Sequence, residues 1–509
     1  MRRSRSARDR RSAGGSQIVQ PPCRNHRNRY PPMEIFSADQ IEAIHLASLA
    51  VLRDTGMNFM LPEAVDILTR EGARVDDDGI RVHFDPEMVM EKIRTVPGEF
   101  TLHARDPANS VRMGRDNIVF SCVASTPNVS DLDRGRLTGN LEDFRNLLRL
   151  TQSLNTAQVV GGYPVEPVDT DVRLRHLICV SEMAKLTSKP LSGYSLGRER
   201  IEDAIEIVRI ARGIDHETLL REPSIHSIVN ANSPLVYDKP MLLGAMILAE
   251  HNQAVVYTPF TLSGAMAPIT IAGALVQQNA EALAGLVFSQ CVNPGAPAIY
   301  GSFTSNVDMK TGSPAFGTPE YAKATIASGQ LARKYGVPLR ASNATASNAP
   351  DAQAAYESQM SLWACVMGGV NYVKHGLGWL EGGLCTNYEK FIIDAEMVQM
   401  MIAFLEPAVV DEDALAVAAI DGVGPASHYF QSPHTMARYE TAFYTPMLSD
   451  WRNFETWEDA GSVDATRRAN GIWKQLLAEY EPPPMDSAIE EELDAFVARR
   501  TAEGGAPPL

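Results

Sequence analysis

Eight short apolar runs recur along the middle of the chain, each followed by a loop of small and polar residues and then by a segment with helical spacing. Run starts about 30 to 44 residues apart fit strand–loop–helix units. Nearly continuous apolar runs are typical of strands buried on both faces. The sequence therefore predicts an α/β fold, a closed parallel (β/α)8 TIM barrel, between about Ile118 and Gly376. The runs are IVFSCVA from Ile118, AQVVGGY from Ala157, PLSGYS from Pro190, SIHSIVN from Ser224, AVVYTPF from Ala254, AIYGSF from Ala298, PLRASN from Pro338 and NYVKHG from Asn371.

Residues at the carboxyl ends of these runs are the candidates for a functional site, because a TIM barrel carries its chemistry there. They are mostly aromatic rings and neutral amides, with few Lys or Arg side chains. Ring faces attract quaternary ammonium groups and amides orient a polar end, so this lining suits a small cation and suits a phosphorylated sugar badly. The candidates are Tyr163, Tyr194, Asn230, Asn232, Tyr257, Phe260, Phe303, Asn306, Asp308, Asn343, His375, Trp379 and Glu381.

One of these candidates stands apart. His375 closes the eighth run and precedes Gly376 and Gly378, whose backbone freedom allows the chain to turn into the cavity. The other histidines are scattered along structural patterns, so no metal site and no protein-bound zinc are expected. No GxSxG elbow, HExxH pair, Walker loop or dinucleotide fingerprint occurs in its required context.

Additional segments flank the predicted barrel on both sides. Helical spacing predicts helices at residues 37–55, 62–71 and 86–96 before it, with small antiparallel strands at 79–85 and 99–114. After it, helices are predicted at residues 387–405, 464–480 and 489–500. Between the first two, the chain continues through residues 411–419 and an irregular segment near residues 423–446. The expected organisation is a disordered basic tail (1–34), an N-terminal extension (35–116), the barrel (117–405) and a mainly helical C-terminal extension (406–509).

Charge is distributed unevenly along the 509 residues. The net charge is −16, yet the first thirty residues carry nine Arg and one Asp. The body is therefore strongly acidic, which argues against nucleic acid as a partner. The Arg-rich tail is expected to be disordered, with a targeting peptide or an arm that binds an acidic partner as alternatives. Six Cys without CxxC spacing and the absence of an eighteen-residue apolar run predict a soluble, cytoplasmic protein with reduced thiols.

Three long stretches, in order along the chain, resemble the trimethylamine methyltransferase (MttB) family of corrinoid-dependent methyltransferases. They are SNVDMKTGSPAFGTPEYAKA from Ser305, PDAQAAYESQMSLWACVMGGVNYVKHGLGWLEGG from Pro350 and DGVGPASHYFQSPHTMARYETAFYTPMLSDWRNFETW from Asp421. The resemblance covers about residues 35 to 480. It implies a TIM barrel that moves a methyl group from a small methylated amine to Co(I) of a corrinoid, with the corrinoid carried by a separate small protein that caps the barrel mouth.

Archaeal trimethylamine enzymes of this family hold pyrrolysine in the cavity, and this chain has no such residue. The corresponding region, RASNATASNAPDAQ from Arg340, contains ordinary residues, and the position matching pyrrolysine falls within residues 341–348. The chain therefore resembles the non-pyrrolysine branch, which includes glycine betaine:corrinoid methyltransferases. A quaternary amine already has a neutral leaving group, so its methyl group can be displaced directly by Co(I) without zinc or an acid.

The resemblance and the strand positions together suggest roles for six residues. Tyr257, Phe303 and Trp379 are expected to contact the cation, and Asn230 to supply a supporting hydrogen bond. His375 and Asn343 are the expected catalytic residues, which orient the polar end of the substrate.

Two other function classes stay open. A Schiff-base or metal-dependent barrel lyase would need a reactive lysine, and Lys374 is the one at a strand end, although strand alternation points it away from the cavity if His375 points in. The other class is a non-catalytic barrel that binds a quaternary amine. The segment His428 to His434 is open to three interpretations, namely a docking surface for the corrinoid protein, a helical bracket or a subunit interface of a homo-oligomer.

Overall fold

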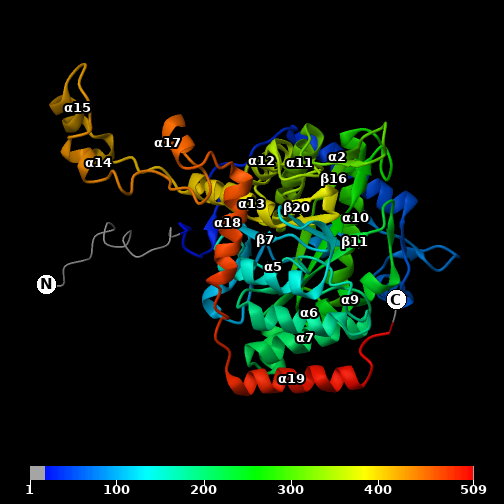
Figure 1. Ribbon diagram of the computed structural model, residues 1–509. Coiled ribbons are helices and arrows are strands. Elements are labelled where there is room, and N and C mark those ends of the chain that lie inside the picture. The colour runs from blue at the N-terminus through cyan, green and yellow to red at the C-terminus, as the bar shows by residue number, and fades with distance from the viewer. Residues whose placement is uncertain (1–17, 508–509) are drawn as a thin grey trace.

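The computed structural model describes residues 18–507, and its centre is a parallel barrel surrounded by helices (Figure 1). Seven barrel strands are hydrogen-bonded as parallel neighbours in the order β7, β19, β18, β15, β13, β11 and β10. Their bounds are Asn117–Cys122 (β7), Leu191–Ser192 (β10), Ile225–Ala231 (β11), Ala254–Pro259 (β13), Ala298–Gly301 (β15), Leu339–Ser342 (β18) and Tyr372–Leu377 (β19).

The second predicted strand closes the barrel without forming a regular strand. Val159 pairs with Ser121 through an isolated parallel bridge, and the Val160 amide donates to the carbonyl of Pro190 at 3.0 Å. This segment therefore fills the gap between β7 and β10. The predicted eight-fold barrel is confirmed, and the regular strand expected at residues 157–163 is corrected to a short irregular link.

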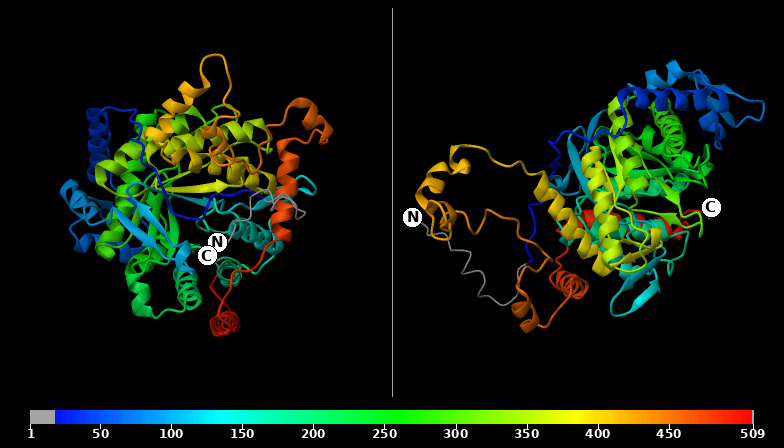
Figure 2. Two further views of the ribbon diagram at one scale, coloured as in Figure 1. Left: turned by 90° about the vertical axis from the view of Figure 1, so that its left-hand side faces the viewer. Right: turned by 90° about the horizontal axis from the view of Figure 1, so that it is seen from above.

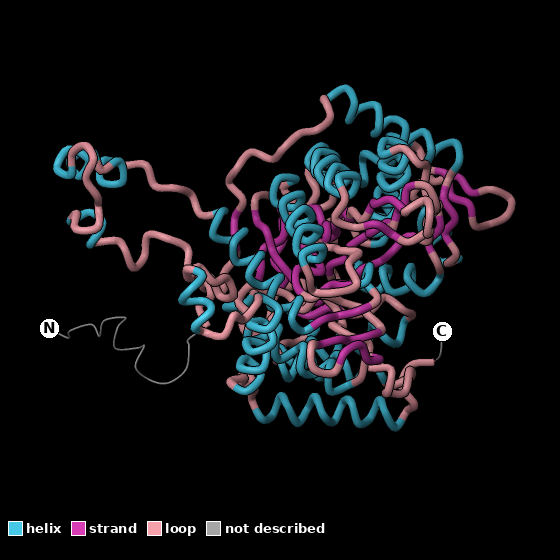
Figure 3. The backbone as a smooth tube through the Cα atoms, turned by 45° about the horizontal axis from the view of Figure 1, so that its top comes forward, coloured by secondary structure: helices cyan, strands magenta, loops and turns pink. Residues whose placement is uncertain are grey.

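Helices that follow the strands form the outer ring of the barrel (Figure 3). Polar side chains at Asn140, Asp238, Thr270, Thr318, Asp351 and Asn387 accept backbone hydrogen bonds and so fix the starts of six of them. The helices are α5 (Leu141–Ser153), α6 (Arg175–Leu186), α7 (Arg198–Arg212), α9 (Lys239–Glu250), α10 (Ile271–Val292), α11 (Pro319–Tyr335), α12 (Ala352–Gly368) and α13 (Tyr388–Leu405). No helix of the described residues is long and apolar enough to cross a membrane.

The N-terminal extension packs against helix α10, and Phe59 is its central contact. The Phe59 ring lies 6.0 Å from Phe288 of α10 and 5.7 Å from Tyr237. A capping box at Ser37 starts the first helix. The elements are α2 (Ala38–Ala50) with a π-helical turn (Val51–Thr55), β2 (Met57–Phe59), α3 (Pro62–Arg70), β3 (Arg74–Val75), β4 (Arg81–His83), α4 (Pro86–Ile93), β5 (Glu99–Leu102) and β6 (Val111–Gly114).

The described part of the segment that was predicted to be a disordered tail is ordered against the barrel. Strand β1 (His26–Arg27) pairs antiparallel with β7, and His26 is buried. The Asn28 side chain donates to the carbonyl of Val366 at 2.6 Å. Burial and hydrogen bonding to the barrel thus replace the expected disorder over this part, while the Arg-rich residues 1–17 lie outside the described residues.

The C-terminal extension begins as an arm at the end of the barrel opposite the mouth. Tyr30, just after β1, donates to the carbonyl of Phe404, so the end of α13 lies near the start of β7. Helices α14 (Glu412–Leu415) and α15 (Val417–Val423) stand well away from the barrel (Figures 1 and 2). The segment His428 to His434, which includes α16 (Pro433–Met436) in part, belongs to this arm and does not line the mouth of its own barrel.

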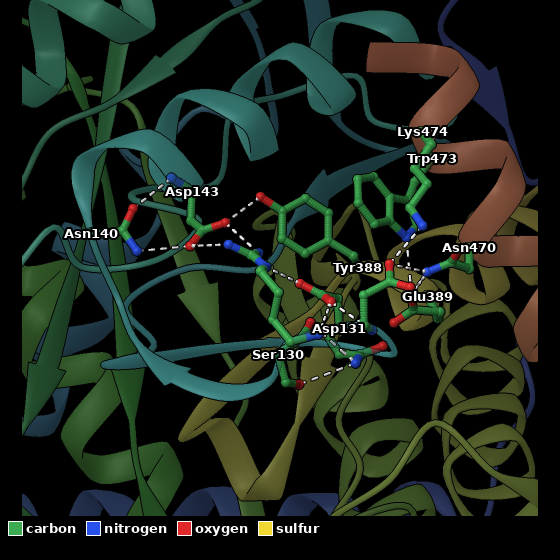
Figure 4. A network of polar contacts seen from close by, with 12 residues as sticks. Ser130, Asp131, Asn140, Asp143, Tyr388, Glu389, Asn470, Trp473 and Lys474 are labelled. Carbon is green, nitrogen blue, oxygen red and sulfur yellow. Dashed lines mark hydrogen bonds and ion pairs between the residues drawn. The ribbon is translucent and has the colours of Figure 1, made fainter. Parts of the chain in front are cut away.

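The chain returns from the arm to cover the side of the barrel. After α17 (Phe454–Asp459), helix α18 (Ala465–Ala478) packs against α13 and α5, and α19 (Ser487–Ala502) packs against α6 and α7. Glu389 at the start of α13 accepts hydrogen bonds from Asn470 at 2.9 Å and Trp473 at 3.0 Å (Figure 4). These bonds fix α18 to the barrel.

Polar contacts next to those of Glu389 hold a hairpin beside the barrel mouth. Arg134 lies in the turn between strands β8 (Asn128–Asp131) and β9 (Gly135–Thr138) and pairs with the buried carboxylates of Asp131 and Asp143. Tyr388 also donates to Asp143 at 2.7 Å. Burial acts to raise the pKa of Asp143, but hydrogen bonds from Arg134, Tyr388 and Asn140 outweigh it and hold that pKa below its usual value.

Replacing Arg134 by Met should destabilise the protein, because it leaves two buried carboxylates without their cation. The expected loss is about 1 to 3 kcal/mol near pH 7, because the Arg134 side chain is 44% exposed and solvent screens part of each ion pair. A lowered carboxyl pKa stabilises the fold above the unfolded pKa and stops doing so as pH falls through the folded value. The difference between Arg134→Met and wild type should therefore shrink below about pH 4. Denaturant unfolding from pH 3 to pH 8 measures it.

Arg221→Met is the matched control, because Arg221 pairs with Glu217 on the exposed surface. Its loss should be below about 1 kcal/mol at every pH. Equal losses in the two variants would contradict the stabilising role of the Arg134 network.

Candidate active site

A cavity of about 740 Å³ opens at the carboxyl ends of the barrel strands. It is the position at which a TIM barrel holds its active site. Three kinds of side chain line it: aromatic rings, small polar groups and buried charges. The lining includes Ser125, Glu166, Tyr194, Asn230, Asn232, Met241, Phe260, Phe303, Arg340, Lys374, His375 and Trp379.

Aromatic rings form one continuous wall of this cavity. The ring of Trp379 lies 4.3 Å from that of His375 and 6.0 Å from that of Phe303, and Phe303 lies 5.2 Å from Phe260. The Trp379 indole donates to the carbonyl of Thr345 at 3.0 Å, which fixes the ring orientation. The wall therefore offers fixed ring faces and edges to a small ligand.

Trp379 is carried by a small sheet at the barrel mouth. It belongs to β20 (Trp379–Leu380), which pairs with β21 (Cys385–Asn387), and β21 pairs with β8 of the hairpin described above. Glu381 follows directly and pairs with Arg136 of β9 at 3.0 Å. Glu381 is thus a support for this wall and does not line the cavity.

The eighth strand is irregular where it reaches the cavity. His375 has a φ of 57°, and the pairing of β19 with β7 shifts between Val373 and Leu377. This bulge breaks the alternation of side chains, so that Lys374 and His375 both line the cavity. The prediction that Lys374 points away when His375 points in is therefore wrong, because it assumed a regular strand.

A buried polar cluster holds the bulge in place. Asn343 donates from Nδ2 to the carbonyl of Gly376 at 3.0 Å and to Asp394 at 3.1 Å. Asp394 also accepts from the Gly378 amide at 2.8 Å, and it forms an ion pair with the buried Lys390. Gly378 has a φ of 96°, a conformation that favours glycine, and an added Cβ would meet the ring of Phe391.

His375 is held as a neutral ring. Burial is the main cause that lowers the pKa of His375 well below its usual value, and the nearby Lys374 and Arg340 lower it further. Its Nδ1 lies 3.1 Å from the Ser342 hydroxyl, which leaves Nε2 as the ring atom that can contact a ligand. The arrangement presents an uncharged polar ring beside Trp379 and Phe303.

The cavity contains charges that the sequence interpretation missed. Arg340 and Lys374 are 2% and 6% exposed and both line it, so the expectation of a cavity poor in Lys and Arg is corrected. Glu166 lines it too and accepts from the Tyr194 hydroxyl at 2.9 Å, and burial raises the pKa of Glu166. The sequence does contain a signal for Arg340 and Lys374, because each is a charged residue inside an apolar run, PLRASN or NYVKHG.

The structure brings four of the six residues with predicted roles to the cavity. Phe303, Trp379, His375 and Asn230 all line the cavity. Asn343 lies fully buried beneath the bulge, outside the lining. Tyr257 is not brought to the cavity at all: its hydroxyl contacts Ser289 of α10 at 2.6 Å and its ring faces Gly285. Alternation along β13 turns the Tyr257 ring outward.

The family model for trimethylamine methyltransferase (MTTB) matches residues 1–505. The chain belongs to this family. Glycine betaine methyltransferase of Desulfitobacterium hafniense (strain Y51) is 39% identical over 93% of this chain and 98% of the relative. Trimethylamine methyltransferase MttB2 of Methanosarcina mazei is 27% identical over 91% of this chain and 94% of the relative.

Solved structures agree on the fold. Monomethylamine methyltransferase (MtmB) of Methanosarcina barkeri superposes with a TM-score of 0.51 over 88% of both chains at 10% identity. A hydroxylamine complex of MtmB gives a TM-score of 0.51 over 91% of this chain and 89% of the other, at 11% identity. The protein is therefore a TIM-barrel methyltransferase of the trimethylamine methyltransferase family, and the predicted resemblance is confirmed.

Among residues 18–507, no three His, Cys, Asp or Glu side chains gather as a ligand set for a metal ion. The prediction that the protein binds no zinc stays a prediction.

Replacing Asn343 by Leu should lower methyl transfer at least tenfold, because the backbone that carries His375 loses its support and a 1 Å displacement can slow a reaction about 100-fold. The effect should fall on kcat more than on KM. The double variant Asn343→Leu/His375→Ala should be little slower than His375→Ala alone, because Asn343 acts through His375. Steady-state kinetics of the three variants measure it.

Tyr257→Phe provides a check on the placement of that ring. It removes one hydroxyl outside the cavity and should leave methyl transfer within about twofold of wild type. Independent, additive losses from Asn343 and His375, or a large loss at Tyr257, would contradict the assigned geometry.

Proposed function

We propose that this methyltransferase takes a methyl group from a small quaternary amine, a betaine, and delivers it to Co(I) of a corrinoid carried by a separate small protein. The aromatic wall of Phe303, Trp379 and the neutral His375 is the observation that carries the proposal. Ring faces attract a quaternary ammonium group. The similarity to a glycine betaine methyltransferase over nearly its whole length supports the same substrate class.

Neutral His375 suits this reaction. A protonated ring beside the substrate would repel its ammonium group, and burial prevents that protonation. Loss of a methyl group from a quaternary nitrogen leaves a neutral amine, so no proton has to be delivered. His375 and Asn230 can therefore serve to orient the substrate, while Asn343 acts from below as a positioning residue.

The corrinoid supplies the cobalt nucleophile that accepts the methyl group. A cavity of about 740 Å³ that opens at the mouth of the barrel fits a small amine and leaves its outer side accessible to a carrier protein. We further propose that residues 117–405 are the catalytic unit and that residues 35–116 and 406–509 are extensions. A homo-oligomer stays a prediction.

The cavity contributes to the rate mainly by positioning the methyl group. Each aromatic contact contributes about 0.5 to 2 kcal/mol to binding the cation, but the charge fades as the methyl group leaves. Holding one N-methyl group in line with cobalt can contribute on the order of 7 kcal/mol at best. Binding the cation very tightly would stabilise the ground state instead.

The reaction is tested by anaerobic methylation of Co(I) cobalamin with the purified full-length protein, followed by absorbance. Glycine betaine, other betaines, carnitine, choline and trimethylamine are compared. Methyl-Co(III) formation with a betaine is the expected result. Transfer from trimethylamine alone would overturn the quaternary substrate, and binding of an amine without any transfer would favour a non-catalytic barrel.

Trp379→Leu should weaken binding of the amine by about 2- to 30-fold, which corresponds to the 0.5 to 2 kcal/mol of a cation–ring contact. Trp363→Leu is the matched control, because Trp363 packs against Phe404 outside the cavity. Isothermal titration without corrinoid measures both. Equal affinity in Trp379→Leu and wild type would remove Trp379 from the binding site.

A further inference from the structure

Two cationic side chains reach the cavity from adjacent strands and have no carboxylate beside them. Arg340 lies on β18 and Lys374 on β19, whose pairing places Lys374 opposite Ser342. Both side chains are nearly inaccessible to bulk solvent, and both line the cavity. Neither forms an ion pair within residues 18–507.

The partners that Arg340 does have are neutral. Its Nη1 donates to the carbonyl of Ser302 at 3.1 Å, its guanidinium lies 5.0 Å from the ring centre of Phe303, and its buried Nε has no partner. Burying a cation is unfavourable unless an opposite charge and hydrogen bonds compensate it. Burial lowers the pKa of Arg340 to about 10 and that of Lys374 well below its usual value, and Arg340 lowers that of Lys374 further.

Lys390 provides an internal comparison, since it is also fully buried. It pairs with Asp394 and donates to the Ser358 hydroxyl at 2.7 Å. Lys189 is buried as well, and it donates to the backbone carbonyls of Thr151 at 2.6 Å and Leu154 at 2.8 Å. Each of these two buried lysines therefore has at least two hydrogen-bond acceptors in the protein itself. Among residues 18–507, Lys374 has no such acceptor and Arg340 has the single carbonyl of Ser302, and both side chains line the cavity.

We propose that Arg340 and Lys374 form an anion subsite that binds the carboxylate of the substrate and so selects zwitterionic amines. The inference rests on the proposed function and deepens it. Phe303 joins the two ends of the site, because its ring contacts the Arg340 guanidinium on one side and lies 6.0 Å from Trp379 on the other. A short carbon chain between carboxylate and ammonium can span from Arg340 to the aromatic wall.

The subsite also disfavours the binding of amines that have no carboxylate. An amine without a carboxylate brings a net positive charge next to Arg340 and Lys374, and like charges brought together in a buried site repel each other. Choline has the same trimethylammonium group as glycine betaine and a hydroxyl in place of the carboxylate. Comparison of these two ligands therefore isolates the subsite.

The test is isothermal titration of the full-length protein with glycine betaine, choline and tetramethylammonium, in the absence of corrinoid. Wild type should bind glycine betaine at least tenfold more tightly than choline. Arg340→Met and Lys374→Met should each weaken the binding of glycine betaine by about 10- to 100-fold, which is the effect of losing a hydrogen bond to a charged group. Their affinity for choline should stay the same or rise. Equal weakening of both ligands, or equal wild-type affinities, would overturn the subsite.

Thermal unfolding of the ligand-free variants separates this role from a structural one. Removing an uncompensated buried cation should leave Tm unchanged or raise it, whereas removing a structural cation, as in Lys390→Met, should lower it. A large fall of Tm in both Arg340→Met and Lys374→Met would contradict the proposal. The wild-type comparison of the two ligands needs no variant and so holds even if a variant does not fold.

The binding test also distinguishes failure of the subsite from failure of the proposed function. Selective binding of glycine betaine without transfer to Co(I) cobalamin would support the subsite and reject the proposed methyl transfer. Transfer from choline or tetramethylammonium as readily as from glycine betaine would support methyl transfer and reject the subsite.

Discussion

The site depends on one break in regular structure, the bulge at the end of the eighth strand. A regular strand would direct only one of two consecutive side chains into the barrel. The positive φ of His375 directs Lys374 and His375 into the same cavity. Such a conformation costs about 1 to 3 kcal/mol and persists only where the surroundings fix it. Asn343 and Asp394 do so by holding the backbone of Gly376 and Gly378 from below.

Support for the part of the aromatic wall that carries Trp379 extends to the surface of the molecule. Arg134 fixes the hairpin of β8 and β9 to α5 and α13, and Arg136 of that hairpin pairs with Glu381. Glu381 follows Trp379 by two residues, so the hairpin supports the loop that carries the aromatic wall. Helix α18 lies on the same part of the barrel through its bonds to Glu389. The C-terminal extension thus contributes to the rigidity of the mouth, although its arm lies at the other end.

Sequence patterns predicted the barrel well because its strands are buried on both faces, and burial of that kind leaves long apolar runs. All six residues of β13 and of β19 are buried. Side-chain direction was harder to predict. Tyr257 was assigned to the cavity from its place near a strand end, but a shift of one residue changes the face of the sheet. Lys374 was predicted to point away from the cavity, because no signal in the sequence marks a positive φ at His375. Arg340 was missed because its run was interpreted only as apolar.

The division between charged and aromatic ends of the cavity matters for the rate. During methyl transfer the nitrogen loses its positive charge, so interactions with that charge stabilise the substrate more than the transition state. The carboxylate of a betaine keeps its charge throughout, and binding it affects both states equally. Its binding energy can therefore hold the substrate in position without opposing the reaction, as contacts remote from the reacting atoms do in general. The substrate is therefore positioned best when the aromatic wall binds the ammonium group weakly and the anion subsite of Arg340 and Lys374 binds the carboxylate strongly. An aromatic cage that bound the ammonium group tightly would oppose the reaction. The neutral state of His375 fits this arrangement, because burial, together with the nearby Lys374 and Arg340, lowers its pKa and so disfavours a positive charge beside the ammonium group.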